Sequence, residues 1–542
     1  MLKCIPLDSL KKVFHDEEPR GCGFGGFSLL LGERGSFQAA LFSDADAEIG
    51  ITALSPLNIT ACEVVPIPSN LAMSTGENDD YFKVSESGLY PDLLRPICGK
   101  LRLKAGQWKS VWFEIAGDSG AGQYGVSLRF SAGAEEASAE IAVEIIGAAL
   151  PEQTLICTHW FHTDCLSTRY KAEVFSEEYW RIVENYVSCA VQHGINFILT
   201  PLFTPPLDTE AGGERPTVQL TDVTVTGRDE YEFGFDKLKR WVEMCDRCGV
   251  KYFEMSHLFT QWGAMHAPKI MAFTDGKEKQ IFGWKTWAAS QKYTAFLRQF
   301  ARALNAFIDA QGIRERCFFH VSDEPGQKDI RAYQKRAALI NEIFPGCRVI
   351  DALSDYDFYK KGIIKNPIPA NNHIEPFIGN VPELWTYYCC GQHSNYVSNR
   401  FFSMPSQRNR VLGYQMYKFD VKGFLQWGYN FWYSCLSLFE IDPFETSDAG
   451  GAFPSGDAYV VYPGDGGQPL VSLRLKVFYD AIQDMRALQL LESLIGREKT
   501  VSLLESDTGG AITFSEYPRD DQWHLAKREE INAAIKAQVT QQ

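Results

Sequence analysis

The sequence lacks the segments that would place the chain in a membrane or on nucleic acid. No window approaches the roughly 18 consecutive apolar residues of a membrane span, and the N-terminus has no apolar stretch followed by a small-residue cleavage site. The net charge is −15, and no basic run offsets it, which argues against a nucleic-acid-binding surface. We therefore expect a cytoplasmic protein with no membrane partner and no nucleic-acid partner.

Patterns that bind metals or nucleotides are also scarce. The 14 cysteines are scattered and lie mostly in apolar segments, as reduced core thiols do. One CxxC, from Cys245 to Cys248, falls in a helical pattern and has no second pair of ligands at a zinc spacing. Cys389 and Cys390 form an adjacent pair. We expect no metal site and no cofactor.

Residues 1–150 contain short apolar runs separated by Gly, Ser, Asn and Asp turns. Several runs, such as 124–130 and 139–146, alternate apolar and polar residues, which is typical of strands with one buried face. This pattern predicts an N-terminal β-sandwich domain over residues 1–150. We expect the segment 90–96 inside it to be irregular.

From residue 151 the pattern changes to a strand followed by a helix, repeated about eight times, as in a (β/α)8 TIM-type barrel. We predict a catalytic barrel over residues 151–440. A doubly wound open sheet is the alternative, weakened because no glycine-rich phosphate loop follows the first strand. The predicted strands are 155–161, 196–200, 251–255, 317–321, 348–352, 374–377, 383–389 and 423–428, and the predicted helices are 176–192, 235–248, 286–311 and 330–343.

Residues 441–542 are less regular and predict a short C-terminal extension packed on the barrel. It contains a turn-rich stretch, a strand at 458–463 and a helix at 470–494. The charged helical end of the chain is expected to face solvent. The expected fold class is therefore multidomain β plus α/β, with a β-sandwich, a (β/α)8 barrel and a C-terminal strand and helix extension.

Asp323 and Glu324 are the strongest candidates for chemistry. The apolar run 317–321 predicts a buried strand, and Pro325 stops it because proline cannot extend a sheet ladder. The two carboxylates then lie at the carboxyl end of a parallel strand, where barrels carry their active sites. Taken alone, an Asp-Glu-Pro sequence is more often a surface loop that caps the next helix.

Other predicted strand ends supply aromatic, amide and carboxylate side chains. Rings offer flat apolar faces, and amides and carboxylates bind hydroxyl groups, so together they suit a neutral sugar. Each has a structural alternative: a hydrogen-bonded histidine, an interior ion pair for Glu254, or simple packing for a tryptophan. The candidate substrate-binding residues are His159, Glu254, Trp262, Trp385, Tyr387, Trp427, Asn430 and Trp432.

Six motifs between about residue 90 and residue 490 together resemble glycoside hydrolase family 123 and the related domain of unknown function 4091 group. They are YPDLLRP at 90–96, TQWGAMHAPKI at 260–270, HVSDEP at 320–325, LWTY at 384–387, GFLQWGYNFW at 423–432 and GDAYVVYPG at 456–464. The resemblance implies a β-sandwich followed by a (β/α)8 barrel. It also implies an exo-acting, retaining β-N-acetylhexosaminidase, with N-acetylgalactosaminides favoured, whose substrate provides the nucleophile through its 2-acetamido group.

The resemblance also assigns roles to the two carboxylates. Asp323 would orient the acetamido group and stabilise the oxazolinium ion, and Glu324 would protonate the leaving oxygen and then activate water. By position, Tyr387 is a donor to the acetamide carbonyl, and Trp385, Trp427 and Trp432 are walls of the sugar pocket.

Two other hypotheses for the function stay open. One is a glycosidase on a sugar without the acetamide, pairing Glu324 with a distant carboxylate such as Glu254 or Asp351. The other is a non-catalytic carbohydrate-binding barrel. In every case the expected partner is a carbohydrate. The sequence leaves the oligomeric state open, with a homodimer as one option.

Overall fold

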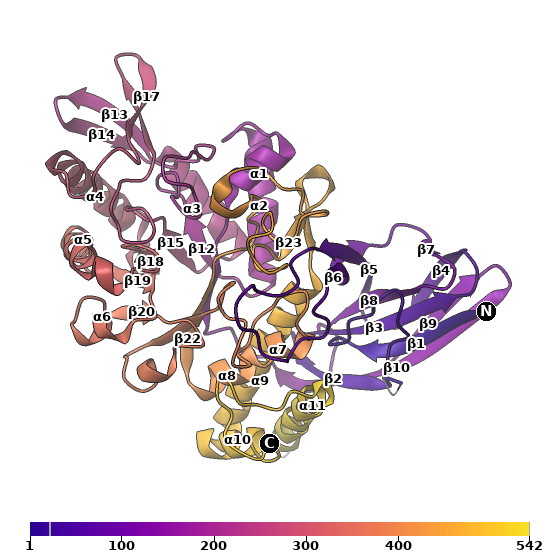
Figure 1. Cartoon of the computed structure of the whole chain (residues 1–542). Helices are drawn as coiled ribbons and strands as arrows, with labels where there is room; N and C mark the ends of the chain where they lie inside the picture. Colours follow the sequence, from indigo (N-terminus) through magenta and orange to yellow (C-terminus); the bar gives the residue numbers. More distant parts are fainter. Residues whose placement is uncertain (21–22, 541–542) are drawn as a thin grey trace.

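The computed structural model describes residues 1–20 and 23–540 of the 542-residue chain. Figure 1 shows a β-rich N-terminal region on one side, an α/β region on the other, and the C-terminal helices between them. The protein is thus a multidomain β plus α/β fold. None of the helices in the described part of the chain is long and apolar enough to cross a bilayer.

Two five-stranded, mainly antiparallel sheets form the N-terminal region and enclose an apolar core that includes Phe37, Phe113 and Phe130. The segment expected to be irregular at 90–96 is instead part of strand β6 (Gly88–Pro96). It tolerates two prolines because it lies at the edge of its sheet. The first sheet has the order β1(Leu2–Asp8), β3(Arg34–Ser43), β8(Trp108–Ala116), β5(Ile59–Ser69), β6, and the second β2(Gly26–Leu31), β10(Glu135–Ala149), β9(Gly122–Ala132), β4(Ala47–Leu54), β7(Leu101–Leu103).

The α/β region holds eight parallel strands in two sheets, of five and three strands, rather than in one continuous closed sheet. Most expected elements are present, because their apolar runs are buried against the flanking helices. The five-stranded sheet is β12(Phe197–Thr200), β15(Tyr252–Met255), β18(Cys317–Phe319), β19(Arg348–Ala352), β20(Asn366–Ile368), and the three-stranded sheet is β11(Ile156–His159), β22(Val421–Gln426), β21(Leu384–Tyr387). The helices are α1(Thr163–Tyr170), α2(Glu177–Gln192), α3(Asp236–Cys248), α4(Gln291–Gln311), α5(Ile330–Ile343), α6(Tyr356–Lys360), α7(Ser406–Arg410) and α8(Leu412–Lys418).

Two features of this region differ from the prediction. The strand expected at 374–377 is a short 3-10 helix, Glu375–Phe377, and the sixth strand is β20, which lies earlier in the chain. A four-stranded sheet that was not predicted projects from the region next to α4 (Figure 1). Its strands are β14(Glu230–Gly234), β13(Asp222–Gly227), β16(Ile270–Thr274) and β17(Lys277–Phe282).

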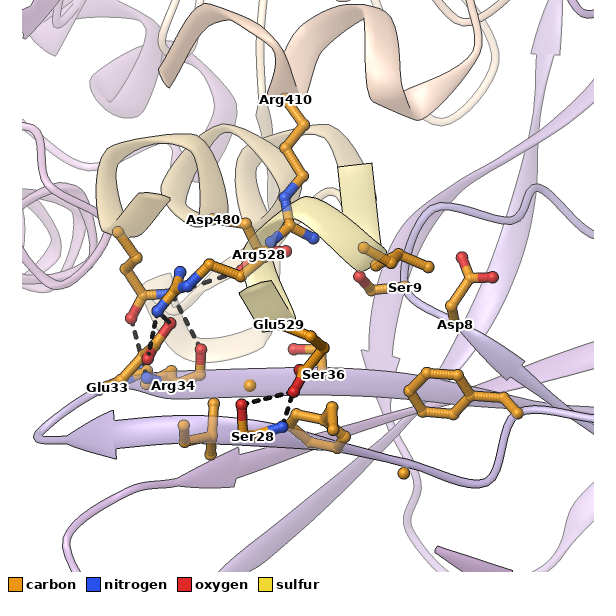
Figure 2. Close-up of a pocket in the computed structure, with 17 residues that line it drawn as sticks. Asp8, Ser9, Ser28, Glu33, Arg34, Ser36, Arg410, Asp480, Arg528 and Glu529 are labelled. Atoms are coloured by element: carbon orange, nitrogen blue, oxygen red, sulfur yellow. Dashed lines mark hydrogen bonds and ion pairs between the residues drawn. The ribbon is translucent and has the colours of Figure 1, made fainter. Parts of the chain in front are cut away.

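The last helix, α11(Asp521–Val539), has the expected solvated face, with Glu529 and Glu530 exposed, but it also buries charged residues that were expected to face solvent. Arg528 is buried and makes ion pairs with Glu33 of the sandwich at 2.7 Å and with Asp484 of α9(Leu473–Ile495) at 2.8 Å. Glu529 also accepts hydrogen bonds from the backbone and hydroxyl of Ser28 (Figure 2). Charged residues can be buried when each meets an opposite charge, and here they join the sandwich to the C-terminal helices.

A pocket of about 570 Å³ lies at this junction, lined by residues of the sandwich, α7, α9 and α11, and by none of the candidate site residues. The remaining C-terminal elements are β23(Val461–Pro463), β24(Pro469–Val471) and α10(Arg497–Leu504).

Candidate active site

A second pocket, of about 650 Å³, opens where the parallel strands of the α/β region end. It brings together four of the expected site residues at its wall, Asp323, Glu324, Tyr387 and Trp427, with Trp262 at its rim. Among the described residues that line it, none is lysine or arginine, so its charge is negative. The other lining residues are Trp160, Leu207, Asp208, Gln261, Ala352, Cys389, Cys390, Leu425 and Phe453.

The backbone around Asp323 and Glu324 is held by two neighbouring loops. Glu324 has a left-handed backbone (φ 42°), and its N–H donates to the carbonyl of Ala352, the last residue of β19, at 3.1 Å. The Asp323 carbonyl accepts the N–H of Trp262 at 3.0 Å. A left-handed conformation costs energy for a residue other than glycine, and such strain collects at functional sites. This turn lets the two adjacent carboxylates line the same pocket.

The two carboxyl groups influence each other electrostatically. Part of Asp323 is exposed, but burial of its carboxyl group, together with the adjacent Glu324 carboxylate, raises the pKa of Asp323 well above its usual range. The Tyr387 hydroxyl donates to Glu324 Oε1 at 2.5 Å. The pair is therefore suited to hold one proton between two acids, as general acid–base chemistry requires.

A buried ionic network lies behind the pocket. His320 Nε2 is 2.7 Å from Glu254 Oε1, and its Nδ1 is 3.2 Å from Asp351 Oδ1. Burial alone would lower the pKa of His320, but the hydrogen bonds and charges of these two carboxylates raise it to about 9. Glu254 also accepts Trp160 Nε1 at 2.7 Å and so fixes that ring of the pocket wall. Asp351 accepts the N–H of Val321 at 3.0 Å, which anchors the backbone leading to Asp323.

This network contains the one cluster of potential metal ligands found among the described residues. Donor atoms of His257, His320 and Asp351 all lie within 4.8 Å of one another. Both ring nitrogens of His320 lie within hydrogen-bond distance of a carboxylate, and its pKa is raised to about 9, so at neutral pH the protonated ring offers no lone pair to a metal. The residues present do not fit a metal site.

Another part of the pocket wall was not predicted as part of the site. Asp208 follows β12 through a long loop and has a left-handed backbone (φ 41°). Its N–H donates to Gln261 Oε1 at 2.6 Å, and its Oδ2 accepts the N–H of Leu436 at 3.2 Å. Burial raises the pKa of Asp208 to about 6.

Several expected substrate-binding residues have structural positions instead. Trp385 is 1% exposed and lies in the core between the sheets with Phe197 and Phe318. It points to the same side of β21 as Tyr387 but lies one layer deeper, so only Tyr387 reaches the pocket. Glu254 is equally buried, behind the wall rather than in it.

His159, Asn430 and Trp432 also lie away from the pocket. His159 is adjacent to Thr158, whose hydroxyl faces Glu254, and therefore points to the opposite side of β11, where its Nδ1 is 3.2 Å from Arg400. Both ends of the Asn430 amide bind the backbone of His162. Trp432 Nε1 donates to the Val461 carbonyl at 3.2 Å.

Trp427 and Trp262 both line the pocket, as their positions in the sequence suggested. Trp427 lines the pocket beside Phe453, and its Nε1 donates to Asp457 Oδ2 at 2.8 Å, which fixes the ring. Trp262 is 52% exposed at the rim, with a left-handed backbone (φ 56°). Exposed aromatic faces beside carboxylates are typical of sugar-binding pockets.

Comparison with known proteins agrees with this description. The family described as "Glycoside hydrolase 123, catalytic domain" matches residues 160–491. No curated protein matches the chain. Among solved structures, a family 123 glycoside hydrolase from Clostridium perfringens, studied for glycolipid glycan hydrolysis, is 14% identical with a TM-score of 0.74, over 100% of this chain and 98% of that one.

Two further structures show weaker similarity. An endo-β-1,4-mannanase from Thermotoga petrophila is 11% identical with a TM-score of 0.34, over 62% of this chain and 77% of that one. A β-glucuronidase from Parabacteroides merdae is 10% identical with a TM-score of 0.33, over 82% of this chain and 49% of that one.

Proposed function

The chain belongs to glycoside hydrolase family 123, and on this premise we propose that it is an exo-acting, retaining β-N-acetylhexosaminidase that favours N-acetylgalactosaminides. The observation that carries the proposal is the arrangement of three side chains in one pocket. Asp323 and Glu324 line it from adjacent positions, and the Tyr387 hydroxyl binds Glu324 at 2.5 Å. Two neighbouring acids suffice when the substrate provides its own nucleophile, because no protein carboxylate is then needed across the sugar ring.

In the first step Asp323 accepts the acetamido N–H, and the acetamide carbonyl oxygen attacks C1. Glu324 donates its proton to the glycosidic oxygen, and the leaving group departs with it. In the second step the Glu324 carboxylate takes a proton from water, which attacks C1 and opens the oxazolinium ion. Two inversions at C1 retain the β configuration.

The proton must reside on Glu324 when the first step begins. The raised pKa of Asp323 means that, without substrate, this carboxyl group competes for the proton. A hydrogen bond from the acetamido N–H to Asp323 favours the ionised form of Asp323 and so removes this competition. Binding of the correct substrate thereby prepares the acid.

Tyr387 has a role that differs in detail from the one expected. Its hydroxyl hydrogen is directed at Glu324 rather than left free for an acetamide. Once Glu324 is protonated, that bond is no longer charge-assisted, and the hydroxyl can turn toward the acetamide carbonyl. We propose that Tyr387 serves both groups in turn.

Neither distant carboxylate suits the alternative glycosidase mechanism. Glu254 and Asp351 are fully buried behind the pocket wall and both bind His320. A nucleophile must reach the anomeric carbon, and these two groups have no exposed oxygen to do so.

We also propose that the two parallel sheets act as one (β/α)8 barrel over residues 151–440, between a sandwich domain at 1–150 and an extension at 441–542. Support comes from the two joints between the sheets. A parallel bridge pairs Ala370 with Tyr387 at one joint, and the Asn196 N–H donates to the Cys157 carbonyl at the other.

The activity is tested with a chromogenic β-N-acetylgalactosaminide against the matching β-galactoside. We expect hydrolysis of the first only, because the galactoside lacks the internal nucleophile. Proton NMR of the reaction should show the β anomer as the first product. Equal rates on both substrates, or an α anomer formed first, would contradict the mechanism, and no turnover on either would favour a non-catalytic sugar-binding protein.

A further inference from the structure

The pocket contains a carboxylate and an amide that the proposed reaction does not use. Asp208 comes from the loop after β12, and Gln261 comes from the loop after β15. Both line the same pocket as Asp323 and Glu324. Neither takes part in the proton transfers or the acetamide contacts, so a different role must explain why both residues line the pocket.

Gln261 lines the pocket and carries hydrogen-bond donors that no described residue uses. The residue is 6% exposed, and its Oε1 accepts the Asp208 N–H at 2.6 Å, which fixes the orientation of the amide. Its Nε2 has no hydrogen-bond partner among the residues that the structure describes. Buried amide donors are nearly always satisfied, so this NH2 group calls for a partner that the chain does not supply, a water molecule or a ligand.

Asp208 presents an acceptor beside these donors. The Leu436 N–H binds Oδ2 at 3.2 Å, while the described residues place no donor on Oδ1. The residue is held in its left-handed conformation (φ 41°) by the hydroxyl of Ser437, which donates to the Asp208 carbonyl at 2.7 Å. A left-handed backbone costs free energy for aspartate, and here a distant loop stabilises it. Such strain is typical of functional positions.

We propose that Asp208 and Gln261 form a subsite that recognises a hydroxyl group of the sugar in the pocket, and through it selects neutral pyranosides. Asp208 Oδ1 accepts the hydroxyl hydrogen, and Gln261 Nε2 donates to the hydroxyl oxygen. A hydroxyl group is both a donor and an acceptor, so this pair of side chains matches it fully. The inference rests on the proposed function in one respect, that the ligand is a sugar.

The negative charge of the pocket also determines which class of sugar it accepts. With Asp208, Asp323 and Glu324 it carries three carboxyl groups, and none of its described lining residues is a cation. Burial raises the pKa of Asp208 to about 6, so at neutral pH it is mostly ionised. A carboxylate or sulfate in place of the recognised hydroxyl would meet this negative charge without a partner, and such sugars are rejected.

The test compares the aryl β-N-acetylgalactosaminide with its 3-, 4- and 6-deoxy derivatives in the wild type and in Asp208→Asn. Asparagine retains an acceptor for the Leu436 N–H but places an NH2 where the hydroxyl hydrogen must bind. In the wild type we expect removal of one of the three hydroxyl groups to lower kcat/KM by about 10- to 100-fold, as for a charge-assisted hydrogen bond. In Asp208→Asn, removal of the same hydroxyl group should lower kcat/KM by less than about 3-fold, because the hydrogen bond to Asp208 is already lost in this variant.

Gln261→Glu is a second variant for the same position. It keeps an acceptor for the Asp208 N–H but replaces the NH2 donors with a charge. The deoxy derivative that is hydrolysed poorly by the wild type should therefore be hydrolysed by this variant about as well as the parent glycoside. Glu210→Gln, an exposed position on the Asp208 loop, is the matched control and should discriminate as the wild type does. Thermal unfolding of each variant reports whether it folds.

The proposal would be overturned if, in both variants, the ratio of kcat/KM between the parent and each deoxy derivative stays at its wild-type value. An equal loss of kcat/KM on the parent and on every derivative would overturn it too. If the parent glycoside is not hydrolysed at all, the proposed function fails separately, and calorimetric binding of N-acetylgalactosamine and its deoxy derivatives provides the same comparison. Binding that is selective for one hydroxyl only through Asp208 would then still support the subsite.

Discussion

Substitution of His320 offers a quantitative test of the electrostatics behind the pocket. In the folded chain the imidazolium lies between Glu254 at 2.7 Å and Asp351 at 3.2 Å, and all three are buried. The variant His320→Gln keeps a hydrogen-bonding group of similar size but removes the positive charge. We expect it to change the pH dependence of stability in a defined window.

The magnitude follows from the pKa of His320, which is raised from its ordinary value of 6.5 to about 9. At about 1.4 kcal/mol per pKa unit, this corresponds to about 3 kcal/mol of stabilisation of the folded state. Since the folded state holds the proton more tightly than the unfolded chain, the contribution is complete below pH 6.5. It is lost progressively as the pH rises through 9.

Urea unfolding of the wild type and of His320→Gln at several pH values between 6 and 10 measures this directly. The difference in the free energy of unfolding between the two proteins should shrink by about 3 kcal/mol across that range. Titration of buried groups that do not interact with His320 cancels in the difference. His373→Gln, at an exposed histidine, is the control and should show no such pH dependence.

A difference in unfolding free energy that stays constant from pH 6 to 10 would contradict this prediction, because it would mean that His320 is neutral in the folded protein. Activity gives an independent readout. Asp351 accepts the N–H groups that lead to Asp323, so the wild-type kcat should fall with an apparent pKa near 9 as the network loses its charge.

Other substitutions test the site and its supports. Glu324→Gln should lose most turnover on glycosides with poor leaving groups but much less on activated aryl glycosides, since only the former need protonation; equal losses would exclude Glu324 as the acid. Asp323→Asn should lower kcat on both kinds of substrate, and full activity would remove it from the site. Trp385→Ala should lower the free energy of unfolding by about 3–5 kcal/mol, a core effect that thermal unfolding would detect. Because burial raises the pKa of Asp480 to about 7, Asp480→Asn should stabilise the protein by about 2–4 kcal/mol at pH 8 but not at pH 4, as urea unfolding at both pH values would show.

Strands with continuous apolar runs were predicted within a few residues, because full burial on both faces demands such runs. β12, β15 and β19 are examples, and the helix at 330–343 has the expected bounds. β17 was missed because its residues Lys277–Phe282 are mostly exposed and charged. β20 was missed because it is three residues long and contains a proline.

The charged end of the chain was predicted only in part, for a different reason. Charge alone favours a solvent-facing helix, but Arg528 finds Glu33 and Asp484, which are distant in sequence. Sequence patterns report that a residue is charged and not whether a partner from another element will meet it.

The order of the β-rich and α/β regions could be predicted from the sequence, and so could the place of Asp323 and Glu324 after a buried strand. Both follow from local signals, namely the apolar run and the proline that ends it. Which side chains reach the pocket depends on how the strands and loops pack together. Periodicity sets the side of a strand that a residue faces, and the stagger of the sheets sets its depth, so Tyr387 lies in the site and Trp385 in the core. Asp208 and Gln261 meet there because two loops far apart in sequence converge, which no local pattern encodes.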